Sequence, residues 1–98
     1  MANLALFVQL KAKPGKESDV GEFLKSALPW ANAETGTTSW FALKLNASTF
    51  GIFDSFANEE DRDTHLSGPI ATALMQKADE LLSEPPSIQK VDVLAAKL

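Results

Sequence analysis

The segment TFGIFDSFANEEDRDTHLSGP, residues 49–69, decides the fold of this chain, because a strand in it runs directly into a helix. Large apolar residues occupy both parities of the strand: Phe50, Ile52 and Phe56 share one face, and Phe53 lies on the other. A strand with one face in water would alternate apolar and polar residues. We therefore expect a central strand that is covered on both faces.

Helix boundaries are marked by residues with positional preferences. Pro29 has no N–H to donate to the preceding turn, so we expect the first helix to kink near residues 26–28. Asn58 is a good N-cap for the helix that follows the central strand. Gly68 ends that helix, and Pro69 suits the first position of the next one.

The order of elements predicts an α+β fold with the ferredoxin-like β-α-β-β-α-β arrangement, in a single domain spanning residues 1–98. In this arrangement a four-stranded antiparallel sheet carries the helices on one face. The strands are expected at residues 3–11, 37–45, 50–56 and 88–95, and the helices at residues 16–33, from 59 to the break at 68, and at 70–83.

Composition excludes several classes of partner and site. The net charge is −4 and no cluster of Lys or Arg occurs, so neither nucleic acid nor an anionic membrane surface is expected as a partner. The absence of cysteine excludes disulfides and thiolate metal sites. The start, MANLALFVQL, lacks the basic region and cleavage site of a signal peptide and is too short to span a bilayer, so we expect a cytoplasmic protein.

Apolar side chains on both faces of the strands also predict a homodimer. Two amphipathic helices can cover only one face of the sheet. A contiguous apolar surface on the order of several hundred Å² is unusual for a monomer. A second copy that packs sheet to sheet with two-fold symmetry would cover it. Any small-molecule pocket is then expected between the helices and the sheet, or at the mouth of that space.

Four segments resemble the antibiotic biosynthesis monooxygenase (ABM) domain family: PGKE, ETGTTSWFAL, FGIFDSFANEEDRDTHLSG and PPSIQKVDVLAAKL. The resemblance covers nearly the whole chain and implies a dimeric α+β barrel built from ferredoxin-like protomers. The family includes cofactor-free oxygenases of phenols and quinols, haem-degrading relatives and an isomerase of a phosphorylated sugar. For this chain it implies a cofactor-independent monooxygenase of a small aromatic or quinol substrate, with no cofactor and no metal.

Several positions depart from the family pattern. Oxygenase members tend to have tryptophan where this chain has Phe56, and some have asparagine where it has Ile52. Haem-degrading relatives have asparagine at the position of Val8 and histidine near Met75, so haem degradation is disfavoured. By the resemblance, Val8, Ile52 and Phe56 would contact the substrate. Trp40 would stack against an aromatic ring, or alternatively fill the core.

His65 and Asp54 are the candidate catalytic residues. His65 is the only side chain that titrates near neutrality. It could be a general base or a substrate contact, or a histidine that bonds a neighbouring backbone group or carboxylate and fixes the helix break at Gly68. Asp54 shares the parity of apolar residues, where an unpaired carboxylate is costly. It could be an acid or base with a raised pKa, or the partner of Lys44 or Arg62.

Two other functions remain open. The first is a non-enzymatic small-molecule-binding or stress-response module on the same dimeric fold. An ion-paired Asp54 in a closed core would favour this module, whereas an open pocket holding Asp54 unpaired beside His65 would favour an enzyme. The second is an isomerase of a small carbonyl compound, in which only Lys44, Arg62 and Lys90 are placed to hold a phosphate.

Overall fold

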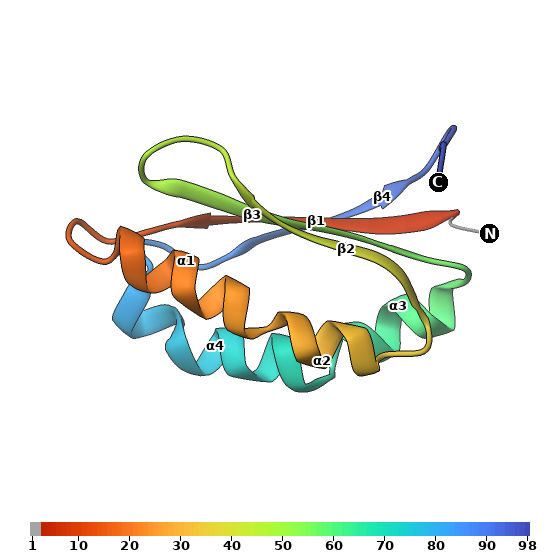
Figure 1. Cartoon of the computed structure of the whole chain (residues 1–98), viewed down its shortest axis with the longest axis horizontal. Helices are drawn as coiled ribbons and strands as arrows, with labels where there is room; N and C mark the ends of the chain where they lie inside the picture. Colours follow the sequence, from red (N-terminus) through yellow and green to blue (C-terminus); the bar gives the residue numbers. More distant parts are fainter. Residues whose placement is uncertain (1–2) are drawn as a thin grey trace.

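Four antiparallel strands form one sheet in the order β2-β3-β1-β4 (Figure 1). The computed structural model describes residues 3–98 and confirms the β-α-β-β-α-β arrangement, with each helical segment divided into two helices. β3 is central, as predicted, because β1 and β2 both pair with it. The elements are β1 (Leu4–Lys11), α1 (Glu17–Ser26), α2 (Leu28–Ala33), β2 (Thr37–Lys44), β3 (Thr49–Phe56), α3 (Glu59–Leu66), α4 (Pro69–Leu81) and β4 (Ser87–Asp92).

Both helical segments break at the predicted points. Ala27 separates α1 from α2, and Pro29 lies in the first turn of α2, where its missing N–H leaves no hydrogen bond unmade. Asn58 caps α3, since its side chain accepts a hydrogen bond of 2.8 Å from the backbone N–H of Asp61. Pro69 then opens α4.

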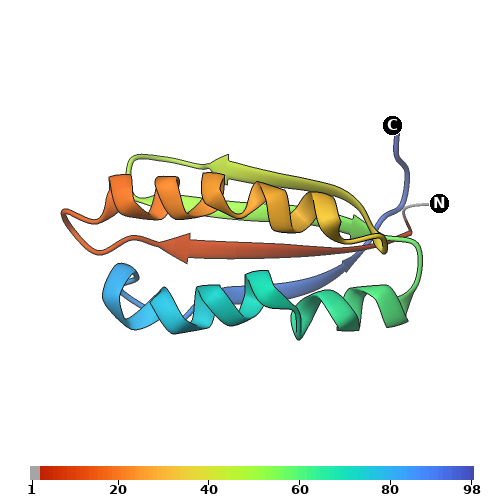
Figure 2. The ribbon, with the colours of Figure 1, turned by 60° about the horizontal axis from the view of Figure 1, so that its bottom comes forward.

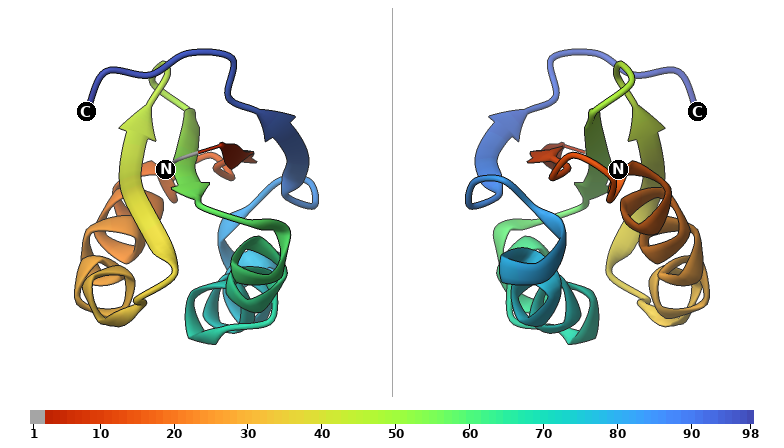
Figure 3. Two further views of the ribbon diagram at one scale, coloured as in Figure 1. Left: turned by 90° about the vertical axis from the view of Figure 1, so that its right-hand side faces the viewer. Right: turned by 90° about the vertical axis from the view of Figure 1, so that its left-hand side faces the viewer.

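β4 is shorter than predicted and ends at Asp92, three residues early. Asp92 pairs with Leu4, which is the first residue of β1. Beyond this pair the N–H of Val93 still donates to the carbonyl of Asn3 at 2.9 Å, and no further strand pairing of β4 occurs within residues 3–98. The chain then leaves the sheet on the side away from the helices (Figure 3). The other element ends lie within two residues of their predicted positions.

All four helices lie on one face of the sheet (Figures 2 and 3). The core fills the space between the two layers: Leu6, Leu10 and Phe56 of the sheet are at most 1% exposed, and α1 buries Val20 and Leu24 against them. Within residues 3–98, none of the helices has the length and apolar character needed to cross a membrane.

Gly21 occupies the interior of α1 without a packing reason. A Cβ added there would approach nothing closer than the ring of Phe50, at 3.7 Å, which is ordinary van der Waals contact. Glycine inside a helix costs about 0.5–1 kcal/mol relative to alanine. We therefore expect Gly21→Ala to raise the free energy of unfolding in urea by about that amount.

Gly36→Ala is the matched control for that measurement. A Cβ on Gly36 would lie 2.6 Å from Cγ of Asp61, so this substitution should lower the free energy of unfolding. Destabilisation by Gly21→Ala as well would show that α1 tolerates no side chain at this position.

The face of the sheet opposite the helices carries no helix within residues 3–98 and is apolar at its centre. The strand register places Phe41 opposite Phe53, and Phe53 opposite Phe7, which makes one row of rings across three strands. Phe41 is 52% exposed, and Phe7 and Phe53 are partly exposed. The prediction that the central strands have two apolar faces is thus confirmed. The second copy that would cover this phenylalanine row stays a prediction.

Candidate functional site

Asp54, His65 and Glu34 meet between the sheet and the helices, each from a different element. Asp54 projects from β3 and His65 from the last turn of α3, and Glu34 is the C-cap residue that follows α2. Nε2 of His65 lies 2.8 Å from Oδ2 of Asp54, and Nδ1 lies 2.5 Å from Oε1 of Glu34. The hydroxyl of Thr37 donates to the same Glu34 oxygen at 2.7 Å. The histidine therefore bridges two carboxylates in an Asp54–His65–Glu34 cluster.

Local structure places each member of the cluster. Asp54 pairs in register with Leu6 and Trp40, on the face that the helices cover. The Asn58 cap fixes where α3 begins, and the imidazole of His65 turns back onto β3, with its ring centroid 5.2 Å from that of Phe56.

The two histidine contacts require two protons within the cluster. A neutral imidazole carries only one N–H, and a carboxylate can only accept a hydrogen bond. Since both nitrogens of His65 face carboxylate oxygens, either the ring is an imidazolium or one carboxyl is protonated. His65 therefore offers no free lone pair in this arrangement. Proton exchange belongs to the cluster as a whole.

Burial and mutual contact shift the pKa values of the cluster. Burial raises the pKa of Asp54, which is 1% exposed, and the hydrogen bond and charge of His65 offset only part of this rise. Burial also lowers the pKa of His65, but the hydrogen bonds and charges of Asp54 and Glu34 outweigh it, so this pKa is raised. Both raised pKa values mean that Asp54 and His65 hold their protons more tightly in the folded protein.

A surface hollow of about 270 Å³ opens beside this cluster. The side chain of Glu34 is 18% exposed and lines the hollow, whereas Asp54 lies behind it. Within residues 3–98, Oε2 of Glu34 and Oδ1 of Asp54 have no hydrogen-bond partner. Glu34 is therefore the carboxylate of the cluster whose side chain lines the hollow, with its Oε2 buried and its Oε1 bonded to His65 and Thr37. The hollow is lined by residues 33–37 and by Asp61, Thr64, His65, Gly68 and Pro69.

None of the four residues predicted to contact a substrate lines the hollow, because three of them lie in the core and the partly buried Trp40 packs against it. Val8, Ile52 and Phe56 are at most 7% exposed. Trp40 packs against the core from β2, opposite Asp54, and its Nε1 is buried with no partner among residues 3–98. Their contact with a substrate stays a prediction.

Asp54 pairs with neither Lys44 nor Arg62, the partners considered from the sequence, because His65 occupies that role. The guanidinium of Arg62 is buried and donates to the backbone carbonyl of Ala5 at 3.3 Å. Lys44 lies at the other end of the sheet, with Nζ 6.0 Å from the ring centroid of Phe50.

Sequence reasoning missed Glu34. It stands in the segment Glu34-Thr35-Gly36, which looks like an ordinary turn between a helix and a strand. The short spacing to Thr37, which bonds the same carboxylate, was the only local signal. Across residues 3–98, His, Cys, Asp and Glu side chains do not gather in any group of three that could hold a metal ion.

Solved structures at low sequence identity share this fold. One is a Nitrosomonas europaea protein provisionally named an antibiotic biosynthesis monooxygenase, with 14% identity, a TM-score of 0.83, and coverage of 95% of this chain and 91% of that one. Another, from Caulobacter crescentus and with the same provisional name, has 12% identity and a TM-score of 0.81, over 96% of this chain and 92% of that one. The chain thus has an ABM-like α+β fold.

A more similar structure is NE2512, a protein of unknown function from Nitrosomonas europaea. It is 63% identical, superimposes with a TM-score of 0.98, and the match covers 100% of this chain and 95% of NE2512. No protein-family model matches the sequence, and no curated protein matches it. The chain belongs to the same protein family as NE2512.

Proposed function

We propose that this chain is a cofactor-independent monooxygenase that takes a small aromatic or quinol substrate at the hollow beside Glu34. The observation that carries the proposal is the Asp54–His65–Glu34 cluster, which holds protons in a buried setting and lines the hollow with the side chains of Glu34 and His65. The provisional names of two structural neighbours support this class of reaction. The hollow, at about 270 Å³, lies just below the range of roughly 300–1,000 Å³ for drug-sized ligands, which suits a substrate of one or two rings.

The proposed reaction converts a phenol and O₂ into a quinone and water. Deprotonation at Glu34 gives a phenolate, which passes one electron to O₂. The two radicals then combine at a ring carbon that bears hydrogen, forming a hydroperoxide. Loss of that ring proton and cleavage of the O–O bond leave the second carbonyl, and the other oxygen atom departs as water. The cluster would accept the phenol proton and return a proton to the leaving oxygen.

Glu34→Gln tests the proposal, because glutamine keeps the shape of the side chain but cannot accept a proton. With naphthols and hydroquinones we expect the rate of oxygen uptake to fall by about 10²–10⁴-fold, the usual contribution of a positioned acid–base group. Quinone formation should fall in parallel, and circular dichroism should show an unchanged fold.

The control is Glu60→Gln, an exposed carboxylate in the first turn of α3, which should leave the rate unchanged. Oxygen uptake that survives Glu34→Gln would remove the assigned role of Glu34. A wild-type protein that consumes no oxygen with any of these substrates would remove the monooxygenase.

The second candidate is a non-enzymatic small-molecule-binding module, and one observation favours it: Asp54 is enclosed, and its Oδ2 is paired with Nε2 of His65 at 2.8 Å. In this case a phenol would bind without oxygen uptake, and Glu34→Gln would leave its affinity unchanged. The isomerase is disfavoured, because no Lys or Arg is among the residues lining the hollow. Lys90 pairs with Asp63 at 3.7 Å, and neither residue lines the hollow.

We also propose that two copies associate through the phenylalanine row on the open face of the sheet. Phe41, Phe53 and Phe7 form a continuous apolar strip there, and Leu43 and Val91 lie partly exposed on the same face. A two-fold axis through the strip would bring the same side chains together from both copies. The helices and the hollow lie on the opposite face and would stay accessible.

A further inference from the structure

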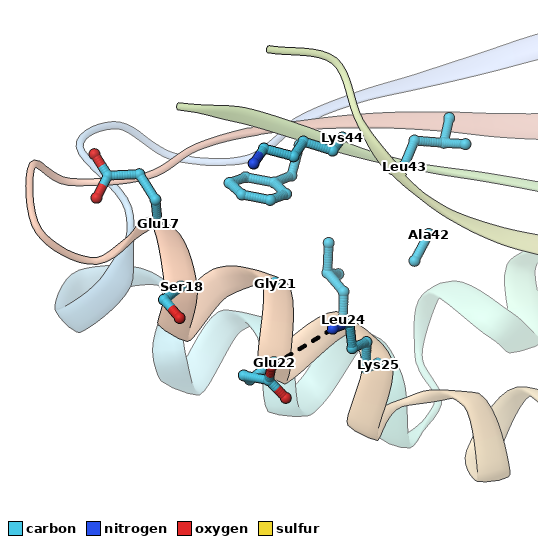
Figure 4. Close-up of a pocket in the computed structure, with 10 residues that line it drawn as sticks. Glu17, Ser18, Gly21, Glu22, Leu24, Lys25, Ala42, Leu43 and Lys44 are labelled. Atoms are coloured by element: carbon cyan, nitrogen blue, oxygen red, sulfur yellow. Dashed lines mark ion pairs between the residues drawn. The ribbon is translucent and has the colours of Figure 1, made fainter. Parts of the chain in front are cut away.

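A larger cavity, of about 490 Å³, lies between α1 and the β2–β3 hairpin (Figure 4). It is remote from the Asp54–His65–Glu34 cluster: Phe50, which lines it, precedes Asp54 by four residues on β3, or about 13 Å at the usual rise of an extended strand. Its volume falls within the range of roughly 300–1,000 Å³ typical of small-molecule sites. Neither the proposed reaction nor the phenylalanine row uses it.

The hairpin cavity has an apolar part and a polar part, since half of its lining residues are polar or charged: Glu17, Ser18, Glu22, Lys25 and Lys44. Leu24 of α1 and Phe50 of β3 are nearly buried and form its apolar part, one from the helix layer and one from the sheet. Ala42 lies opposite Ile52 in the register and so faces the helices, yet it is exposed. The helix-facing surface of β2 is therefore left partly open above α1, where a flat ring could lie.

Gly21 keeps this space open. A Cβ there would project toward the ring of Phe50, at 3.7 Å, and so into the cavity. The helix would be more stable with alanine at this position, and packing permits one. Glycine at this point is therefore explained by the open volume and not by a close contact.

One cation at this cavity has no carboxylate partner. Lys25 pairs with Glu22 at 3.5 Å, whereas Nζ of Lys44 has no carboxylate oxygen within 4.0 Å among residues 3–98. Figure 4 shows Lys44 on the strand side and Leu24 on the helix side of the same space. Glu17, in the first turn of α1, also lines the cavity and would repel an anion.

We infer that the hairpin cavity binds a small aromatic carboxylate, with its ring against the apolar part formed by Leu24 and Phe50 and its carboxylate at Lys44. The apolar part of the cavity accepts the ring, and the ammonium group of Lys44 selects an acid over a neutral or cationic analogue. This inference is independent of the monooxygenase, since it concerns a different cavity and a binding event without a reaction.

The test is a titration with 2-naphthoate, followed by calorimetry and by amide chemical shifts of isotope-labelled protein. Shifts should centre on Gly21, Leu24 and Lys44. Affinity should fall in the order 2-naphthoate, 2-naphthol, 2-naphthylmethylamine. Lys44→Gln should weaken naphthoate binding about threefold to fivefold, the worth of an exposed ion pair, and Glu17→Gln should strengthen it.

Gly21→Leu and Ala42→Phe supply a steric test, because each fills the cavity from a different element and should abolish binding. Both variants should retain the circular dichroism spectrum of the wild type. The inference is overturned if the shifts centre on the hollow or on the phenylalanine row, if the amine binds as tightly as the acid, or if Lys44→Gln leaves the affinity unchanged.

Discussion

Replacing His65 with alanine should lower the free energy of unfolding by about 3–5 kcal/mol, because removing one partner of a buried ion pair leaves an uncompensated charge in the interior. In this chain two carboxylates lose their partner at once, since His65 contacts both Asp54 and Glu34. Asp54 has no route to solvent at 1% exposure. Urea denaturation at pH 7, followed by circular dichroism, measures the loss.

The contribution of His65 should also depend on pH. Its pKa is raised in the folded protein, so the stabilisation is fully present below its unfolded value of 6.5 and is lost as pH rises through the higher folded value. The pKa of Asp54 is also raised, because burial disfavours the ionised carboxylate in the folded protein. Its contribution to the free energy of unfolding is therefore also lost as pH rises above its unfolded pKa of 3.8. The difference in unfolding free energy between wild type and His65→Gln should therefore shrink as pH rises above about 6.5.

Two comparisons separate this effect from a general loss of packing. Asp54→Asn combined with His65→Gln removes the buried charges together and should recover much of the stability that His65→Ala loses. Asp63 lies on the same helix as His65 and forms an exposed pair with Lys90 of β4 at 3.7 Å. Asp63→Ala breaks this pair and should lower the free energy of unfolding by less than about 1 kcal/mol. A similar loss in Asp63→Ala and His65→Ala would contradict a special role for the cluster.

Replacing Phe53 with lysine should dissociate the proposed dimer. Phe53 lies at the centre of the phenylalanine row, between Phe41 and Phe7. A two-fold interface carries each substitution twice, so two ammonium groups would enter the same apolar contact. Like charges at an interface cost several kcal/mol, which weakens association by about 10³-fold or more.

Light scattering at micromolar concentration should give twice the chain mass of 10.6 kDa for the wild type and the mass of one chain for Phe53→Lys. Gln89→Lys is the control, because Gln89 lies in the same row on the edge strand β4 and is already exposed. It should leave the dimer intact. A wild-type protein of 10.6 kDa under these conditions would remove the dimer and leave the open face without its proposed cover.

The fold could be predicted because its signals are local. The parity of Phe50, Ile52 and Phe53 identifies a strand with two apolar faces, whatever lies next to it. The Asn58 cap acts over three residues of chain, and Pro29 acts on the turn that precedes it. The end of β4 could not be read in this way, because it depends on where a distant strand begins.

The sequence by itself therefore determined the order of elements, the central strand, the helix breaks and the choice of His65 and Asp54 as the notable polar groups. Only the tertiary structure decided that these two residues touch and that Glu34, 31 residues before His65 in the chain, completes their cluster. It also decided that Val8, Ile52 and Phe56 pack in the core and do not line the hollow. The physical reason is that parity assigns a side chain to a face of the sheet, whereas the contacts between elements distant in sequence determine whether that face meets a neighbour, a cavity or solvent.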